Sequence, residues 1–277
     1  MNGAVRTFAE FEGRPAFRQR LRRLARDTAV WLLSLAASPA SGTNWIRFPY
    51  YHHVLDDERA GFDRQLRWMR RFGEFIGWEE AVALLASGQP VDGRYFCLSF
   101  DDGFKSCRTN ALPILVERGA LGTAFFLPTA YMDTDVGRDR ELLLGFYDHR
   151  RTLMEFMSWD DARDLAAAGM VVGSHSHGHA NLARLDAAAA AAELARSKTI
   201  LEEKMGAPCL HFGCPFGRPG IDFIPDRDPA LAHQAGYASF ATTARGAMRA
   251  GDSPLFIRRD HTLAGWGDYQ LRWFLSR

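Results

Sequence analysis

Short apolar runs alternate with amphipathic stretches from about residue 46 to the end of the chain. A short apolar run bounded by turn residues is typical of a buried strand, whereas apolar positions that recur every three or four residues indicate a helix. The predicted strands are 46–54, 95–100, 122–127, 170–174, 209–215, 237–242 and 255–259. The predicted helices are 62–72, 78–87, 105–118, 159–168, 187–205, 229–235 and 267–276.

Strands that alternate with helices over most of a chain favour a parallel sheet. Seven such units form either an open doubly wound sheet or a barrel of the (β/α) kind, and in both cases chemistry gathers at the carboxyl ends of the strands. Polar and titratable residues crowd the positions just after the predicted strands, which are 52–53, 101–102, 128, 175–179, 215–217 and 259–261. We therefore expect a functional site along that edge.

Composition narrows the class of protein without pointing to a partner. Of the 277 residues, 47% are hydrophobic and 24% are charged, which is ordinary for a soluble globular chain. A formal net charge of +1 offers no general attraction for nucleic acid, so nucleic acid is excluded as an expected partner. We expect a basic N-terminal arm over 1–45 and one catalytic domain over 46–277.

The four cysteines, Cys97, Cys107, Cys209 and Cys214, contain no C-x-x-C pair. This spacing argues against a zinc finger, and four thiols in a chain of this length are too sparse for a disulfide scaffold. We expect buried, unreactive thiols.

The N-terminal arm carries the only targeting signal to consider. Residues 1–26 contain seven Arg and two Glu, and an apolar run follows at 28–37. That order resembles a signal peptide, but the apolar run is too short to span a bilayer and begins behind the polar Asp27. We expect an amphipathic helix that stays on the protein and lies on its body or on a membrane surface. The expected location is cytoplasmic, with peripheral membrane contact, rather than secreted.

Two adjacent carboxylates, Asp101 and Asp102, lie in the segment SFDDG directly after a predicted strand. Paired carboxylates at a buried strand end cost desolvation and repulsion, so they favour a functional role. A solvated Asp-Asp-Gly turn is the structural alternative.

Three histidines lie within five residues in the segment SHSHGH at 174–179, also directly after an apolar strand. Neutral imidazole is a common metal ligand. His175 and His179 converge on one ion if the chain turns helical there, and His177 then points elsewhere. Two imidazoles and one carboxylate leave a coordination position open for water, which is a catalytic pattern. A surface histidine cluster is the alternative.

Together these segments resemble the polysaccharide deacetylase family, the NodB-homology enzymes of carbohydrate esterase family 4. Further matches in the same order are YHHV at 51–54, ALPIL at 111–115, TAFF at 123–126 and CPFGRPG at 214–220. The resemblance covers roughly residues 46–262 and implies an irregular (β/α)7 barrel that removes acetyl groups from amino sugars.

The resemblance also implies roles for individual residues. Asp101 matches the general base, and Asp102 matches the metal ligand beside His175 and His179. The implied ion is zinc, with cobalt or nickel as substitutes. The backbone N–H of Phe216 matches the oxyanion donor. His261, a histidine late in the chain, is our candidate for the general acid.

Many family members carry an Arg where this chain has Gly213, and that Arg orients the base. Arg218, Arg258 and Arg259 are the candidates to replace it. The remaining pocket residues that we assign to substrate binding are His52, Pro215, Arg259 and Trp266.

The expected substrate is an acetylated amino-sugar glycan, in a polysaccharide, lipopolysaccharide or capsule precursor. Two alternative enzymatic activities are hydrolysis of another C–N amide bond and hydrolysis of an O-acetyl ester. An inactive sugar-binding member is the alternative from another class.

Overall fold

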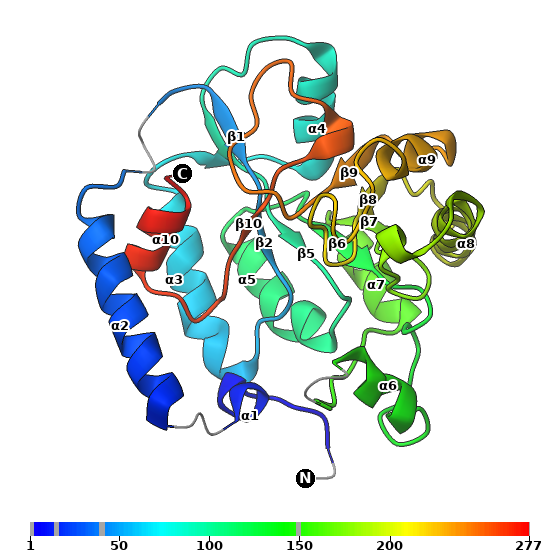
Figure 1. The fold of residues 1–277 in the computed structure, drawn as a ribbon, viewed down its shortest axis with the longest axis horizontal. Coiled ribbons are helices and arrows are strands. Elements are labelled where there is room, and N and C mark those ends of the chain that lie inside the picture. The colour runs from blue at the N-terminus through cyan, green and yellow to red at the C-terminus, as the bar shows by residue number, and fades with distance from the viewer. Residues whose placement is uncertain (1–2, 14–16, 39–41, 148–150, 277) are drawn as a thin grey trace.

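The computed structural model describes residues 3–13, 17–38, 42–147 and 151–276. Its centre is a parallel sheet in the order β10-β2-β5-β6-β7-β8-β9 (Figure 1). The last strand of this sheet, β10, therefore pairs with its first strand, β2, as in a barrel. This order excludes the open doubly wound alternative. The seven strands are β2 (Pro49–Tyr51), β5 (Ser99–Phe100), β6 (Ala124–Leu127), β7 (Val171–Ser174), β8 (His211–Gly213), β9 (Ser239–Ala241) and β10 (Asp260–His261). The predicted (β/α)7 barrel is confirmed.

A second, smaller sheet has the order β1-β4-β3. It consists of β1 (Trp45–Arg47), β4 (Arg94–Phe96) and β3 (Glu74–Phe75). The predicted strands 46–54 and 95–100 each divide in two, because the chain passes from the small sheet into the barrel within each run. Burial on both sides explains why neither run shows alternation: β1, β2 and β5 are buried at every position.

Helices cover the outside of the barrel, and their starts follow local chemistry. Helix α8 begins at Asp186, whose side chain accepts a hydrogen bond from the Ala189 N–H, and ends at a left-handed Gly206. Helix α7 begins with a capping box at Ser158. The helices that follow predicted segments are α3 (Arg59–Met69), α4 (Trp78–Ser87), α5 (Leu112–Glu117), α7 (Trp159–Ala167), α8 (Ala187–Met205), α9 (Asp228–Gln234) and α10 (Asp268–Phe274).

Three parts of the prediction were wrong. The run at 255–259 is not a strand: a 3₁₀ turn spans Pro254–Phe256 because Pro254 starts it and the Ser253 hydroxyl caps it. The edge strand β10 begins only after that turn. The predicted helix 105–118 divides into a π-helical turn (Cys107–Ala111) and α5. The short helix α6 (Arg140–Phe146) was not predicted, since its seven residues, about two turns, give little periodicity.

Large aromatic side chains fill the amino-terminal end of the barrel, below the functional edge. Phe48 and Phe126 pack edge-to-face on the fully buried Trp78, with ring centroids 5.2 and 5.1 Å from it. A Cβ atom at Gly173 or Gly213 would come within 2.7 or 2.6 Å of the Phe126 ring. Glycine at these two positions therefore lets one phenyl ring occupy the centre of the barrel.

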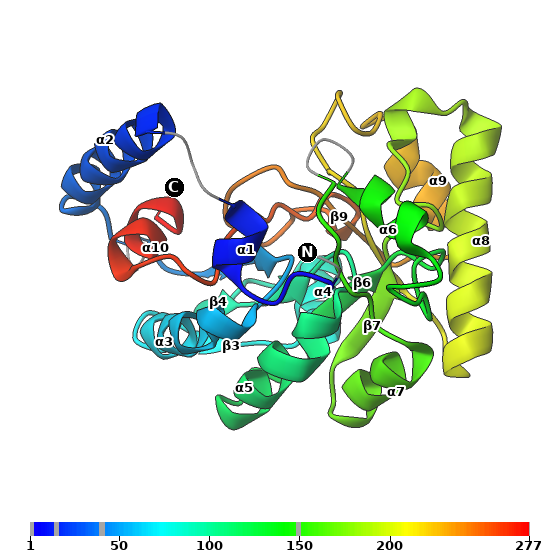
Figure 2. The same ribbon diagram turned by 90° about the horizontal axis from the view of Figure 1, so that it is seen from below.

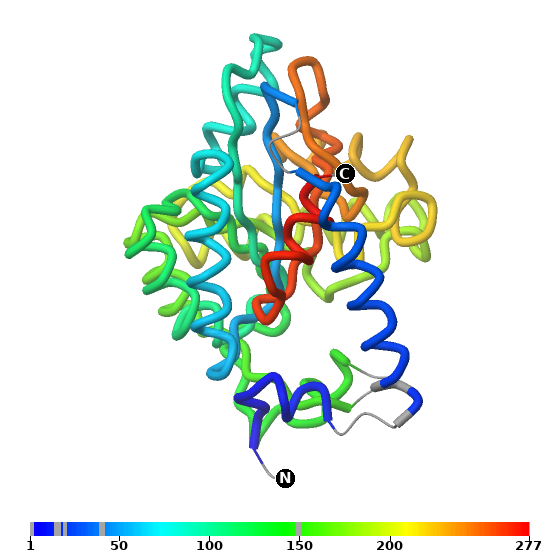
Figure 3. Tube along the Cα trace, turned by 90° about the vertical axis from the view of Figure 1, so that its left-hand side faces the viewer, coloured from blue at the N-terminus to red at the C-terminus, as the bar shows by residue number. Residues whose placement is uncertain are grey.

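The N-terminal arm forms two helices, α1 (Phe8–Glu12) and α2 (Phe17–Ser34). Figure 1 shows α1 at the lower edge of the molecule, the end that faces the viewer in Figure 2, and Figure 2 and Figure 3 show α2 beside α10 on the flank. None of the helices in the described ranges is long and apolar enough to cross a bilayer. All four cysteines are buried and free, as expected.

Candidate active site

A pocket of about 380 Å³ opens at the carboxyl ends of the barrel strands. Residues at or just after the carboxyl ends of six of the seven strands, all but β6, meet in it, as most of the positions after the predicted strands suggested. Its lining residues are Phe11, Tyr50, His52, His53, Asp101, Asp102, Phe146, Tyr147, His175, His179, Phe216, Thr243, His261 and Leu263.

The structure brings Asp102, His175 and His179 together at one end of this pocket. The Nε2 atoms of His175 and His179 each lie 3.3 Å from Asp102 Oδ1, and one ligand atom from each residue lies within 4.8 Å of the others. Ligands about 2.0–2.1 Å from a tetrahedral zinc ion are themselves roughly 3.3 Å apart. The donor set and its spacing therefore fit a divalent metal such as zinc.

Hydrogen bonding prepares His175 for this role. Its Nδ1 lies 2.7 Å from the carbonyl oxygen of Gly213, which can only accept, so Nδ1 carries the proton. The lone pair of the neutral ring is then on Nε2, the atom that faces Asp102. Metal-binding histidines commonly have such a second hydrogen bond, which fixes the tautomer and the ring orientation.

The two histidines converge by a route that we did not expect. The segment is not helical: Ser176 and His179 have left-handed backbones, with φ of 60° and 54°. Asp102 and Phe216 are also left-handed, at 71° and 59°. Four of the seven non-glycine residues with positive φ in the described ranges thus lie in this one region. Such strain costs free energy and concentrates at functional sites.

Asp101 faces the same pocket but has a different partner. Its two carboxylate oxygens accept hydrogen bonds from Arg259 Nη1 and Nη2 at 2.7 and 2.8 Å, a bidentate ion pair. Burial by itself raises the pKa of Asp101, but the Arg259 guanidinium outweighs it and holds the pKa below its usual value. Asp101 is therefore an ionised carboxylate in a fixed orientation.

Of the three arginines that were candidates to replace the one missing at Gly213, Arg259 is the one that pairs with Asp101. It is fully buried, also donates to the Thr242 carbonyl at 2.9 Å, and lies over the Tyr50 ring at 4.4 Å. Our assignment of Arg259 to substrate binding was wrong, because the side chain lies behind Asp101 and does not line the pocket. The other two candidates are ion-paired elsewhere, Arg258 with Asp252 and Arg218 with Asp222.

Burial alone would raise the pKa of the Asp102 carboxyl. The neighbouring imidazoles of His52, His175 and His179 outweigh this effect and hold the pKa of the Asp102 carboxyl well below its usual range. Both carboxylates of the pair are thus charged, and each faces its own set of cationic or donor groups.

His52 and His261 also line this pocket, with ring centroids 5.1 Å apart. Burial, together with His52 and Arg245, lowers the pKa of His261 to about 3. Burial likewise lowers the pKa of His52. Both rings are therefore neutral at neutral pH.

The other predicted residues divide between the pocket and its surroundings. Phe216 is half-exposed and its ring lies 4.8 Å from that of His179. Pro215 and Trp266 do not line the pocket: Pro215 is buried beside it, and Trp266 stacks on Phe274 at 4.7 Å. His177 points away from Asp102 and bonds to the Thr129 hydroxyl at 2.8 Å.

Several pocket residues were missed at the sequence level, among them Phe11 and Tyr147. Phe11 reaches the pocket from α1, and its ring lies 4.9 Å from His53 and 5.6 Å from Tyr147. The Tyr147 hydroxyl donates to Asp102 Oδ2 at 3.4 Å. Neither residue follows a strand, so no motif marked them. They place aromatic faces around the pocket, and part of the N-terminal arm belongs to its wall.

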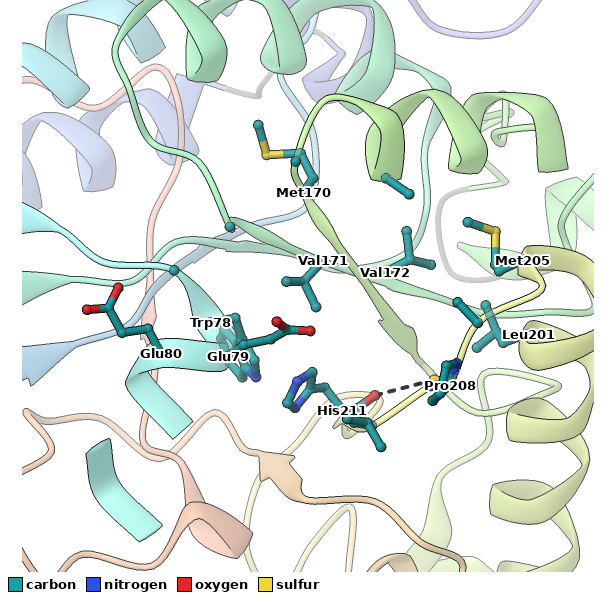
Figure 4. A pocket seen from close by; sticks show the side chains of 17 residues that line it. Trp78, Glu79, Glu80, Met170, Val171, Val172, Leu201, Met205, Pro208 and His211 are labelled. Carbon is teal, nitrogen blue, oxygen red and sulfur yellow. Dashed lines mark hydrogen bonds between the residues drawn. The ribbon is translucent and has the colours of Figure 1, made fainter. Parts of the chain in front are cut away.

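A second cavity, of about 470 Å³, lies at the opposite end of the barrel. Figure 4 shows mainly apolar side chains around it, among them Val171, Leu201 and Met205. His211, which also lines it, is buried, and burial with Lys198 nearby lowers its pKa to about 4. Within the described part of the chain, Asp102, His175 and His179 form the one group of residues positioned to hold a metal ion, and it lies in the first pocket.

Comparison with known proteins agrees with this geometry. The family model described as polysaccharide deacetylase matches residues 88–240, more than half of the chain. YxkH of Bacillus subtilis, described as a candidate polysaccharide deacetylase, is 22% identical over 227 residues, which cover 80% of this chain and 70% of YxkH.

This chain matches nearly the whole length of solved structures with the same fold. IcaB from Ammonifex degensii has a TM-score of 0.69 at 21% identity, over 84% of this chain and 98% of that one. The Streptococcus pyogenes deacetylase PplD, solved with acetate, has a TM-score of 0.66 at 20% identity, over 85% and 100%. At such identities the likeness establishes the barrel fold.

Proposed function

The chain belongs to the polysaccharide deacetylase family, a family of hydrolases of carbon–nitrogen bonds, and we propose that it removes N-acetyl groups from an amino sugar with the help of a divalent metal. One observation supports this proposal above the others. One metal-ligand atom from each of Asp102, His175 and His179 lies close to the others, beside a carboxylate that pairs with a buried arginine.

In this proposal Asp102, His175 and His179 hold the ion. A bound zinc ion lowers the pKa of water toward about 7 and polarises a carbonyl group. Asp101 accepts the proton of the attacking water, since its lowered pKa keeps it ionised and Arg259 fixes both of its oxygens in place. The Phe216 N–H is our candidate donor to the oxyanion that develops on the acetyl group.

An amide nitrogen leaves only when it is protonated, so the reaction also needs an acid. We assign this role to His261, on the wall formed with His52 and Tyr50. Its resting ring is neutral because its pKa is about 3. His261 therefore receives a proton during the cycle, and the proton that Asp101 removes from water is the available source.

Replacement of His261 by Ala is expected to lower kcat on an N-acetyl substrate by about 10²–10⁴-fold and to leave metal content unchanged. An acetyl ester of a phenol needs little protonation of its leaving group, so its hydrolysis is expected to fall far less. Comparing the two substrates with the same variant checks this prediction. Equal losses on both would remove His261 from proton transfer.

We propose an acetylated polysaccharide, lipopolysaccharide or capsule precursor as the substrate. The aromatic faces of Phe11, Phe146 and Phe216 around the pocket suit the apolar face of a sugar ring. Hydrolysis of an O-acetyl ester uses the same groups, but it would not need the acid.

The two reactions are separated by the product. Incubation of the metal-loaded protein with N-acetylated amino-sugar oligomers is expected to release acetate and free amine in equal amounts. If acetate is released only from O-acetylated oligomers, the substrate is an ester rather than an amide. If the metal-loaded protein releases acetate from neither kind of oligomer, the sugar-binding alternative is supported.

A further inference from the structure

Helix α2 turns its polar side, not its apolar side, toward the rest of the protein. Among the α2 side chains that the structure describes, the least exposed lie on one stripe at positions 23, 27, 30 and 34, where Val30 is 9% and Ser34 2% exposed. This stripe includes Arg23, which pairs with Glu12 of α1 at 2.5 Å, and Asp27. An amphipathic helix of a globular protein normally buries its apolar face, so α2 is inverted.

The opposite side of α2 is apolar and exposed. Leu21, Leu24, Trp31, Leu32 and Leu35 are 50, 66, 50, 56 and 61% exposed. At 3.6 residues per turn these side chains share one face. With Leu33, six of the thirteen exposed large hydrophobic residues in the described ranges lie on α2 or just after it. We call the five residues that share a face the α2 apolar face.

Arginines border this face. Arg18, Arg22 and Arg26 are exposed and follow one another at four-residue intervals, so they form a stripe along one flank. Asp27 is the only acidic residue of α2. An exposed apolar face with a basic flank is the pattern of a helix that lies in the plane of a lipid interface.

We propose that the α2 apolar face binds the surface of an anionic lipid bilayer. The apolar side chains insert among the acyl chains, while Arg18 and Arg22 meet the lipid phosphates; Arg26, on the same stripe, pairs with Asp27 at 3.0 Å. Charge complementarity favours lipid over a second copy of this chain, because a second copy would bring another arginine stripe to the same interface. The proposal does not depend on the deacetylase activity.

The test is sedimentation of the full chain with vesicles of phosphatidylcholine alone or mixed with phosphatidylglycerol. Wild-type protein is expected to bind the mixed vesicles, and binding is expected to weaken as salt rises. The variant Leu24→Ser/Trp31→Ser/Leu35→Ser is expected to lose at least about ten-fold in partitioning. Arg18→Gln and Arg22→Gln are expected to cost about five-fold each on anionic vesicles only.

A matched control removes three exposed apolar side chains elsewhere: Leu121→Ser/Leu142→Ser/Ile221→Ser, at positions 51, 47 and 59% exposed. It is expected to bind vesicles as the wild type does. Circular dichroism checks that both triple variants are folded. Wild-type protein that ignores anionic vesicles would overturn the proposal, as would equal binding by the two triple variants. A wild-type dimer that the α2 variant turns into a monomer, without vesicle binding, would assign the face to a second copy instead.

Discussion

Replacement of Asp101 by Asn is expected to lower turnover by about 10²-fold or more while metal content stays near that of the parent. The substitution keeps the shape of the side chain but removes the basic oxygen. Asp101 makes its bonds to Arg259 and not to the histidines, so the ligand set is left intact. Metal analysis and kcat on one preparation measure both effects.

Asp102→Asn is the matched variant at the adjacent position. It removes a negative ligand whose Oδ1 lies 3.3 Å from both histidine nitrogens, so the ion is expected to bind more weakly and excess metal should restore part of the activity. If Asp101→Asn loses the metal and Asp102→Asn keeps it, the two roles must be exchanged. If both variants stay fully active, this pair is not catalytic.

Replacement of Arg259 by Met is expected to reduce the free energy of unfolding by about 3–5 kcal/mol, because it leaves the buried Asp101 carboxylate without its cation. Any folded protein is expected to be a poor enzyme as well. Arg259 lowers the pKa of Asp101, so without it the pKa rises and the base is protonated at a higher pH. Urea unfolding and the acid limb of the pH–rate profile measure the two effects.

The neighbouring Arg258 offers the control. It pairs with Asp252 at 2.6 Å, and both side chains are about one-third exposed, so Arg258→Met is expected to cost about 1 kcal/mol or less. The double variant Arg259→Met with Asp101→Asn is expected to be more stable than Arg259→Met alone, since it buries no unpaired charge. If Arg258→Met is as damaging as Arg259→Met, the buried ion pair is not what matters.

The sequence predicted the site best where its residues follow strands. Asp101, Asp102 and His175 come directly after apolar runs, and parallel strands bring such positions to one edge whatever the details of the helices. Strand order alone is enough for this prediction. It places residues that are far apart in the sequence in one pocket, and the structure does bring them together.

Prediction from the sequence failed where the geometry of the site depends on single backbone torsions or on contacts between residues far apart in the sequence. The convergence of His175 and His179 depends on left-handed torsions at Ser176 and His179, which no side-chain periodicity reveals. Arg259 pairs with a residue 158 positions away, and its neighbour Arg258 has the same chemistry. Only the direction of each side chain separates them, and that follows from the edge strand β10.

The contribution of the N-terminal arm to the pocket could not be predicted from the hydrophobic pattern of the sequence either. Phe11 lies in a five-residue helix, too short for periodicity, and the carboxylate of Asp57 anchors that helix by accepting from the Phe8 N–H at 2.7 Å. The inversion of α2 was equally hidden, because an amphipathic pattern shows two faces without showing which one packs on the protein.

The most direct measurement is a titration of metal-free protein with zinc while acetate release from an N-acetylated amino-sugar oligomer is followed. Activity is expected to rise linearly and to level off at about one equivalent of zinc. His175→Ala and His179→Ala are expected to stay inactive at that point. Full acetate release from protein freed of metal, or unaltered zinc binding by both histidine variants, would contradict a catalytic metal centre at Asp102, His175 and His179.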